Sequence, residues 1–238
     1  MYYLYGFDWT YLVLILPCVL ISAFCQFRVK SAFSEYSKVP NSRNMTGAQA
    51  AEYVLRHNGV TGVTIEHVAG SLTDHFDPRS NTIRLSDTVY GSASVAAVGV
   101  AAHEAGHAVQ HAQQYLPNKI RSAILPIANI GSKLSWILIA VGFIFAFRTD
   151  SNIGLTILYI GIAFFAASVL FTVATLPVEF DASRRALRCF RETNLLSGDE
   201  YSGTRSVLRA AAMTYVASAL TAIMQLVRLL LIANRRRD

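Results

Sequence analysis

Three long apolar runs constrain this chain more than any other feature of its 238 residues. A helix needs about 20 apolar residues to cross a hydrocarbon layer of about 30 Å, and residues 9–27, 131–147 and 153–175 come close to that length or exceed it. Hydrophobic residues make up 53% of the sequence and charged residues only 15%, which is too apolar for an ordinary soluble domain. We therefore expect an integral membrane protein that is mostly α-helical.

A fourth apolar run covers residues 210–233, but it contains Gln225 and Arg228. Polar groups are costly inside a bilayer, so this run can span the membrane, tilt within it or lie partly in the interface. The sequence thus predicts three or four transmembrane helices.

The formal charge of +6 is concentrated in basic clusters beside the apolar runs. These clusters comprise Arg28, Lys30, Lys38 and Arg43, then Arg184, Arg185, Arg188 and Arg191, and finally Arg235, Arg236 and Arg237. Clusters in such positions follow membrane topology, and they lack the interleaved aromatic residues of a nucleic-acid surface. The expected partners are therefore the lipid bilayer and a protein or peptide, with no nucleic acid and with the oligomeric state left open.

The same charges predict an orientation in the membrane. No Lys or Arg precedes the first apolar run, which favours an anchor whose start lies outside the cell. Residues 28–121 and 177–205 then fall on the cytoplasmic side, where Lys and Arg accumulate. A complete fourth span would place residues 235–237 outside, against this rule, so the course of the last segment stays open.

The segment His103-Glu104-Ala105-Gly106-His107 carries the chemistry of the sequence. On a helix, positions i and i+4 lie on one face about 6 Å apart along the axis, so His103 and His107 can both bind one zinc ion through bonds of about 2.0–2.1 Å. Glu104 lies beside them, close enough to move a proton from an attacking water. This pattern predicts a zinc metallopeptidase with Glu104 as the general base.

A catalytic zinc of this kind takes three protein ligands, so a third must come from elsewhere. His111 continues the same stripe, but on an unbroken helix it lies about 12 Å along the axis from His103 and suits a residue that lines the cleft. Glu179 is the preferred ligand because it follows the third apolar run, where Pro177 permits a break and a new helix start. Asp181 is a reserve ligand, or it orients an imidazole.

The segment between the first and second apolar runs reads as a small α+β lobe. Residues 46–57 have helical character, with Thr46 as the N-cap and Asn58-Gly59 as a stop signal. Residues 63–68 and 82–85 alternate as strands around a turn, which predicts a short antiparallel sheet. The motif helix then begins at Ser92 or Ser94 and ends before Pro117.

The expected fold class is therefore an α+β membrane protein: a mostly α-helical chain with three or four transmembrane helices and a small zincin-like lobe. Its expected parts are an N-terminal anchor (1–27), the lobe with the motif helix (28–130), a transmembrane hairpin (131–176), the third-ligand helix with an arginine-rich segment (177–207), and a C-terminal apolar helix with a basic tail (208–238).

Several blocks of the sequence resemble a known family. They are Asp74-His75-Phe76-Asp77-Pro78, Ile83-Arg84-Leu85-Ser86, residues 98–108 around the motif, and Leu176-Pro177-Val178-Glu179-Phe180-Asp181-Ala182-Ser183. Over most of its length the chain resembles the YugP-like membrane zinc metallopeptidases of bacteria. The resemblance implies zinc at His103, His107 and Glu179, Glu104 as the base, and the plasma (inner) membrane of a bacterium as the location.

The chain is more distantly similar to the HtpX and CAAX-prenyl-protease group of membrane gluzincins. That group has an Asp four residues after the third ligand, where this sequence has Ser183. Asp181 or Ser183 is then expected to take over the role of that Asp.

Two further segments are candidates for the substrate cleft. Residues 81–85 could be an edge strand that pairs with a substrate backbone, or an ordinary strand. His75 could act as a donor to the transition state, although a surface histidine in a turn is the preferred interpretation.

These observations predict a zinc-dependent endopeptidase embedded in the membrane. It would hydrolyse membrane-associated or hydrophobic protein substrates at the cytoplasmic face. The alternative is a membrane scaffold or chaperone that binds zinc without proteolytic activity, although such a protein has no use for Glu104 as a base.

Overall fold

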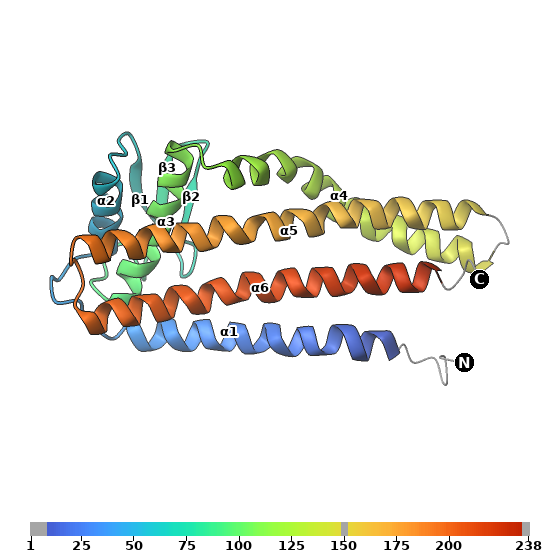
Figure 1. Cartoon of the computed structure of the whole chain (residues 1–238), viewed down its shortest axis with the longest axis horizontal. Helices are drawn as coiled ribbons and strands as arrows, with labels where there is room; N and C mark the ends of the chain where they lie inside the picture. The colour runs from blue at the N-terminus through green and yellow to red at the C-terminus, as the bar shows by residue number, and fades with distance from the viewer. Residues whose placement is uncertain (1–8, 149–151, 235–238) are drawn as a thin grey trace. The chain divides into compact units, whose positions relative to one another are not determined.

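The computed structural model describes residues 9–148 and 152–234 (Figure 1). The predicted basic tail at residues 235–237 lies outside the described residues. The helices are a short π-helix, η1 (Tyr11–Ile15), and then α1 (Leu16–Tyr36), α2 (Gly47–His57), α3 (Val95–Ala112), α4 (Leu116–Arg148), α5 (Asn152–Glu192) and α6 (Gly198–Asn234). The strands are β1 (Thr64–Val68), β2 (His75–Asp77) and β3 (Thr82–Ser86).

The chain divides into two compact units. The first takes its residues from 1–24, 119–175 and 215–238, and the second comprises residues 25–118 and 176–214. The first unit contains most of the predicted apolar runs, and the second contains residues 28–118 of the predicted lobe, whose last residues, 119–130, belong to the first.

Four helices of the described part of the chain are long and apolar enough to cross a membrane: Tyr11–Tyr36, Leu116–Ala146, Asn152–Glu192 and Gly198–Asn234. The fourth apolar run lies within the last of them. The small sheet and the mostly helical remainder confirm the α+β membrane class.

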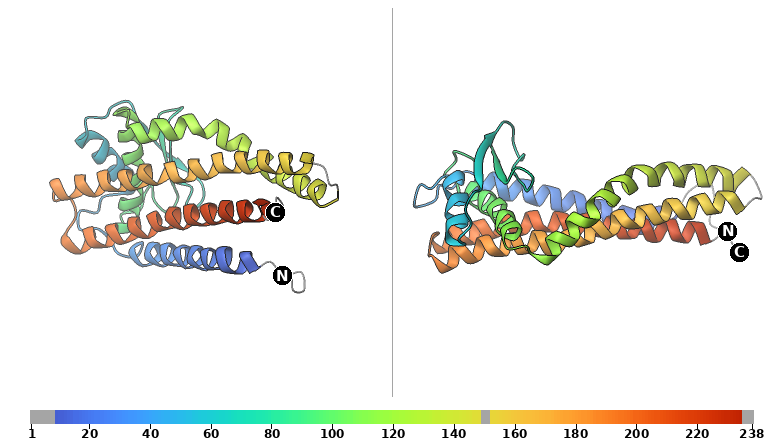
Figure 2. Two further views of the ribbon diagram at one scale, coloured as in Figure 1. Left: turned by 45° about the vertical axis from the view of Figure 1, so that its right-hand side comes forward. Right: turned by 90° about the horizontal axis from the view of Figure 1, so that it is seen from above.

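Close helix contacts in the first unit depend on glycine. A Cβ added to Gly142 would lie 2.5 Å from the backbone nitrogen of Leu158, and one added to Gly161 would lie 2.8 Å from that of Ile139. Small residues let helix backbones approach where no hydrophobic effect drives helices together. Pro126 lies inside α4, which is bent rather than straight (Figure 2), as expected where a proline removes a backbone donor.

Helix α2, in the second unit, begins and ends where the sequence signals predict. The Thr46 side chain accepts a hydrogen bond from the backbone of Gln49, and the Gln49 side chain accepts one from the backbone of Thr46. This capping box satisfies two backbone donors at the helix start. At the other end Asn58 is the C-cap, and Gly59 has a φ of 67°, which glycine adopts without strain.

The sheet is mixed, which corrects the predicted antiparallel sheet. The strand order is β1-β3-β2, with β1 parallel to β3 and β2 antiparallel to β3. The segment after β1 carries the chain past β3 to its far side, where the short strand β2 forms a hairpin with β3. The hairpin partner of β3 is therefore β2, a segment that the sequence pattern predicts to be a turn.

The strand order also decides between the two interpretations of residues 81–85, because they form an ordinary central strand and not an edge strand. β3 is the central strand and pairs on both sides, so its backbone has no edge for a substrate. The edge position next to helix α3 belongs to β2 instead.

Helix α3 begins as predicted and is buried along most of its length. Ser94 is the N-cap, and its side chain accepts a hydrogen bond from the backbone of Ala97. The helix ends at Ala112, and Pro117 lies in the first turn of α4, where a missing backbone donor costs little. The core around α3 includes Ala50, Val54, Ile83, Leu85, Ala97, Val98, Ala101, Ala105, Val109, Ala186 and Phe190.

The predicted helix break at Pro177 is wrong, because α5 runs without interruption from Asn152 to Glu192. A proline inside a helix removes one backbone hydrogen bond, but packing can offset that loss. Val178, which directly follows Pro177, is fully buried, as are Ala182 and Ala186 further along the helix.

Candidate metal centre

Two turns of α3 and one turn of α5 meet at a group of three metal-ligating side chains. The ligand atoms of His103, His107 and Glu179 all lie within 4.8 Å of one another. The Nε2 atom of His103 is 3.3 Å from Oε2 of Glu179, and that of His107 is 3.5 Å from the same oxygen. The histidine side chains are 15% exposed and the Glu179 side chain is 4% exposed, so the group is shielded from bulk water.

This geometry fits a zinc ion. A tetrahedral zinc with bonds of about 2.0–2.1 Å holds neighbouring ligand atoms about 3.3–3.4 Å apart, close to both measured distances. Two imidazole nitrogens and one carboxylate oxygen form the ligand set of the thermolysin type, in which a fourth position remains for water or substrate.

Gly106 permits the close approach of the two helices that carry the ligands. A Cβ at this position would lie 2.5 Å from the backbone oxygen of Ala182 on α5, closer than real Cβ contacts. The glycine between the two motif histidines therefore brings α3 against α5 one turn after Glu179.

Each imidazole is oriented through its second nitrogen. Nδ1 of His103 lies 3.0 Å from Oγ of Ser183, and Nδ1 of His107 lies 3.1 Å from Oε1 of Gln110. With Nδ1 carrying the proton and donating it, Nε2 of each ring is left as a ligand facing Glu179.

Gln110 is fully buried, and its amide group is satisfied on both sides. Its Nε2 donates to the backbone oxygen of Val178 at 2.8 Å and to Oδ2 of Asp181 at 3.0 Å. The network thus joins His107 on α3 to the α5 backbone beside Glu179. Gln110 is not among the predicted site residues, since a glutamine three residues after a histidine carries no metal signal of its own.

The structure separates the two acidic candidates on α5. Asp181 accepts hydrogen bonds from Gln110 and from Nε of Arg185, and it lies outside the group of three ligand atoms. Asp181 therefore supports His107 through Gln110, whereas Ser183 contacts His103 directly.

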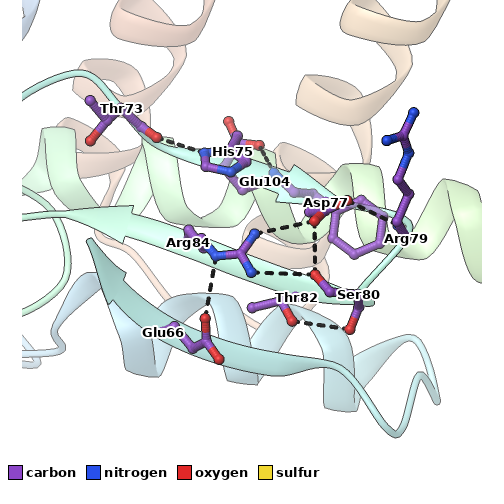
Figure 3. Close-up of polar contacts among 10 residues, drawn as sticks. Glu66, Thr73, His75, Asp77, Arg79, Ser80, Thr82, Arg84 and Glu104 are labelled. Atoms are coloured by element: carbon purple, nitrogen blue, oxygen red, sulfur yellow. Dashed lines mark hydrogen bonds and ion pairs between the residues drawn. The ribbon is translucent and has the colours of Figure 1, made fainter. Parts of the chain in front are cut away.

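Glu104 is held by strand β2. The backbone N–H of Phe76 donates to Oε2 of Glu104 at 3.0 Å (Figure 3). This bond fixes one carboxylate oxygen, and the strand itself is anchored to β3 by the Arg84 guanidinium, which donates to Asp77 at 3.2 Å. The edge strand and the motif helix thus share a hydrogen bond at the residue predicted to be the base.

The other two histidine candidates lie outside the ligand group. His75 is exposed in β2, and its Nδ1 is 2.8 Å from the backbone oxygen of Thr73 (Figure 3). His111 is exposed at the end of α3, where its ring packs 5.7 Å from the ring of Phe76. His111 therefore borders β2, and its role in lining a cleft stays a prediction.

The acidic surroundings of the histidines favour a cation. Burial lowers the pKa of His107, but the hydrogen bond with Glu179 and the negative charges of Glu104 and Glu179 outweigh it and raise the pKa overall. The same two carboxylates that favour a proton on His107 favour a divalent metal ion beside it.

Comparisons with known proteins identify the family of this chain. The chain is 39% identical over 228 residues to "Putative membrane protease YugP" of Bacillus subtilis (strain 168), an alignment that covers 96% of this chain and 98% of the relative. No solved structure matches the chain. The family described as "Putative neutral zinc metallopeptidase" matches residues 11–234, which include every residue of the ligand group. The chain therefore belongs to this family of zinc metallopeptidases.

Proposed function

We propose that the protein is a gluzincin-type endopeptidase, with zinc held by His103, His107 and Glu179 and with Glu104 as the general base. The observation that carries the proposal is the convergence of both Nε2 atoms on one Glu179 oxygen at 3.3 and 3.5 Å. A site that only stabilised the fold would close all four zinc positions with protein ligands, whereas three ligands leave one position for chemistry.

A bound zinc ion would supply a Lewis acid that polarises the scissile carbonyl and makes water a better nucleophile. Glu104 would take a proton from the attacking water and return it to the nitrogen of the leaving amine. The Phe76 amide supports this role because it fixes one oxygen of Glu104 at 3.0 Å and so limits the rotation of the side chain. Ser183 and Gln110 would hold the two imidazoles in the orientation that binding requires.

Strand β2 is the proposed docking edge for the substrate backbone. It is a terminal strand of the sheet order and lies beside α3, which carries the motif. An extended peptide could add to such an edge through those main-chain groups that the Phe76 N–H, which donates to Glu104, leaves available, a common mode of peptide recognition.

We further propose that the site faces the cytoplasm and acts on membrane-associated or hydrophobic proteins. The basic clusters at residues 28–43 and 184–191 support this orientation, since such clusters accumulate on the cytoplasmic side. Labelling tests it: a cysteine at exposed Ser80 should react with an impermeant maleimide only after the cells are permeabilised. The three native cysteines are buried and should not react with the maleimide.

Zinc content and proteolysis, measured together, test the proposed activity. We expect about one zinc per chain in the detergent-purified protein, and cleavage of casein or of a membrane-protein fragment. Glu104→Gln should keep the zinc and lose cleavage by at least about a hundredfold, as expected for removal of a general base. Glu35→Gln, an exposed glutamate on α1, is the matched control and should behave as wild type.

Two further variants test the assignment of the zinc ligands. Glu179→Ala should lose the zinc, whereas His111→Ala should keep it. Zinc retained by Glu179→Ala would overturn the third ligand. Stoichiometric zinc without cleavage of any substrate would favour the alternative, a zinc-binding membrane scaffold or chaperone.

A further inference from the structure

A basic groove lies on the second unit between the C-terminal part of α5 and the N-terminal part of α6. Its volume is about 600 Å³, and five arginines and one glutamate line it: Arg184, Arg188, Arg191, Arg205, Arg209 and Glu192. This groove is distinct from the ligand group, although Ser183, the partner of His103, borders it.

The spacing of these arginines places them in two positively charged stripes, one on α5 and one on α6. Arg184, Arg188 and Arg191 follow one another at intervals of four and three residues on α5, and Arg205 and Arg209 are four apart on α6. Residues at such intervals lie on one helix face, and like charges there repel each other. The two stripes line the same groove, so the repulsion acts between the helices as well as within them.

The positive charge of the groove is largely unbalanced within the protein. Among the residues that the structure describes, Arg184, Arg188, Arg205 and Arg209 make no ion pair or hydrogen bond with another side chain. The one acid of the groove, Glu192, lies 3.2 Å from Nε2 of His57. A bound anion would relieve the repulsion between the stripes, and guanidinium groups suit phosphate because they bind it through two parallel hydrogen bonds.

The groove also has an apolar wall. Phe180, which is 41% exposed, Leu187 and Leu208 line it together with the arginines. In the sequence, the groove residues of α5 follow an apolar run that ends at residue 175, and those of α6 precede or begin one that starts at residue 210. A soluble anion needs only the guanidinium groups, whereas an amphiphile uses the charged and the apolar walls together.

We propose that this groove binds the headgroup phosphate of an anionic phospholipid. The arginines contact the phosphate, and the apolar wall contacts the first methylene groups of the acyl chains. Basic pockets between membrane helices recognise anionic headgroups through this combination of charge and apolar contact. Because Ser183 lines the groove, the bound lipid would lie beside the side chain that contacts His103.

Native mass spectrometry of the delipidated, zinc-loaded protein in detergent tests the proposal. Phosphatidylglycerol and phosphatidylcholine with identical acyl chains are titrated into wild type and into Arg188→Gln/Arg205→Gln/Arg209→Gln. We expect the first phosphatidylglycerol to bind wild type at least about tenfold more tightly than phosphatidylcholine, and this difference to vanish in the triple variant. The control, Arg43→Gln/Arg56→Gln/Arg79→Gln, removes the same charge from exposed positions outside the groove and should bind as wild type.

A single variant and a competition experiment complete the test. Arg205→Glu alone should weaken phosphatidylglycerol binding, and it serves if the triple variant does not fold. Inorganic phosphate should displace the lipid only at concentrations far above those of the lipid. Equal binding by the triple variant and its control would overturn the proposal, as would equal affinity for the two lipids, for inorganic phosphate or for an acidic peptide. The readout does not depend on proteolysis, so failure here would leave the proposed peptidase activity untouched.

Discussion

The Nδ1 atom of His103 lies 3.0 Å from the Oγ of Ser183, although eighty residues separate the two in the sequence. The contact joins α3 to α5 at the first motif histidine. It also gives the position four residues after Glu179 a definite role, because a group that hydrogen-bonds one nitrogen of an imidazole orients the other toward its ligand.

Replacing Ser183 should therefore weaken zinc binding without removing a ligand. We expect Ser183→Ala to lower the zinc affinity about tenfold, the lower end of the range for lost partners of ligating histidines. Ser183→Asp should bind zinc at least as tightly as wild type, since a carboxylate accepts the Nδ1 proton more strongly. Competition with a chromogenic chelator measures both, and Ser34→Ala, on an exposed face of α1, is the control. An unchanged affinity in Ser183→Ala would show that this contact does not orient His103.

Gln110 should contribute to stability as well as to the site. Gln110→Ala leaves the buried oxygen of Val178 without its amide donor, so we expect the free energy of unfolding to fall by about 1–3 kcal/mol. Loss of the hydrogen bond to His107 should also weaken zinc binding about tenfold. Denaturant titration of the zinc-free and zinc-loaded protein separates the two effects. The control is Gln26→Ala on the exposed surface of α1, and equal behaviour of both variants would contradict the role of the network.

Gly106 and Gly91 offer a matched pair of glycine substitutions. Gly106→Ala would place a Cβ 2.5 Å from the Ala182 backbone oxygen, whereas nothing lies within 4 Å of a Cβ at Gly91. We expect Gly106→Ala to lower the stability by about 1–3 kcal/mol, the usual cost of overpacking, and to weaken zinc binding by separating α3 from α5. Gly91→Ala should leave both quantities near wild type. Equal thermal midpoints for the two variants would mean that α3 and α5 are not in close contact at Gly106.

Asp77 should make the stability of the hairpin depend on pH in acid. The backbone N–H of Arg79, the Ser80 hydroxyl and the Arg84 guanidinium lower the pKa of Asp77 to about 2 from its usual value of 3.8. A lowered pKa means that the contribution is complete above the unfolded pKa of about 4 and is lost as the pH falls toward 2. We expect the thermal midpoint of wild type to fall more steeply than that of Asp77→Asn between pH 4 and pH 2. Parallel curves for the two proteins would contradict this assignment.

Local chemistry made much of the fold predictable. The Thr46 cap, the long apolar runs and the cap at Ser94, one of the two candidates, depend on neighbours in the sequence, and each lies where the pattern predicted it. The motif histidines face one direction because helical geometry alone requires it. These features need no knowledge of the rest of the chain.

The errors concern features that distant segments decide. The parallel pairing of β1 with β3 depends on which side of β3 the chain passes, and three residues of β2 give too short a signal to show it. The helix continues through Pro177 because buried residues after it pack against other elements, which no local rule reveals. Gln110 could not be predicted for the same reason, because its role depends on hydrogen bonds to Val178 and Asp181, which are distant in the sequence.

The order of the proposed ligands along the chain has a consequence for biosynthesis. The two histidines and Glu104 leave the ribosome early, whereas Glu179 arrives only after α4 and most of α5 have been made. A nascent chain that ends within α4 therefore carries the proposed base and two of the three proposed ligands but lacks Glu179, which completes the set. The proposed hydrolytic activity would then be acquired only once most of the chain has been translated.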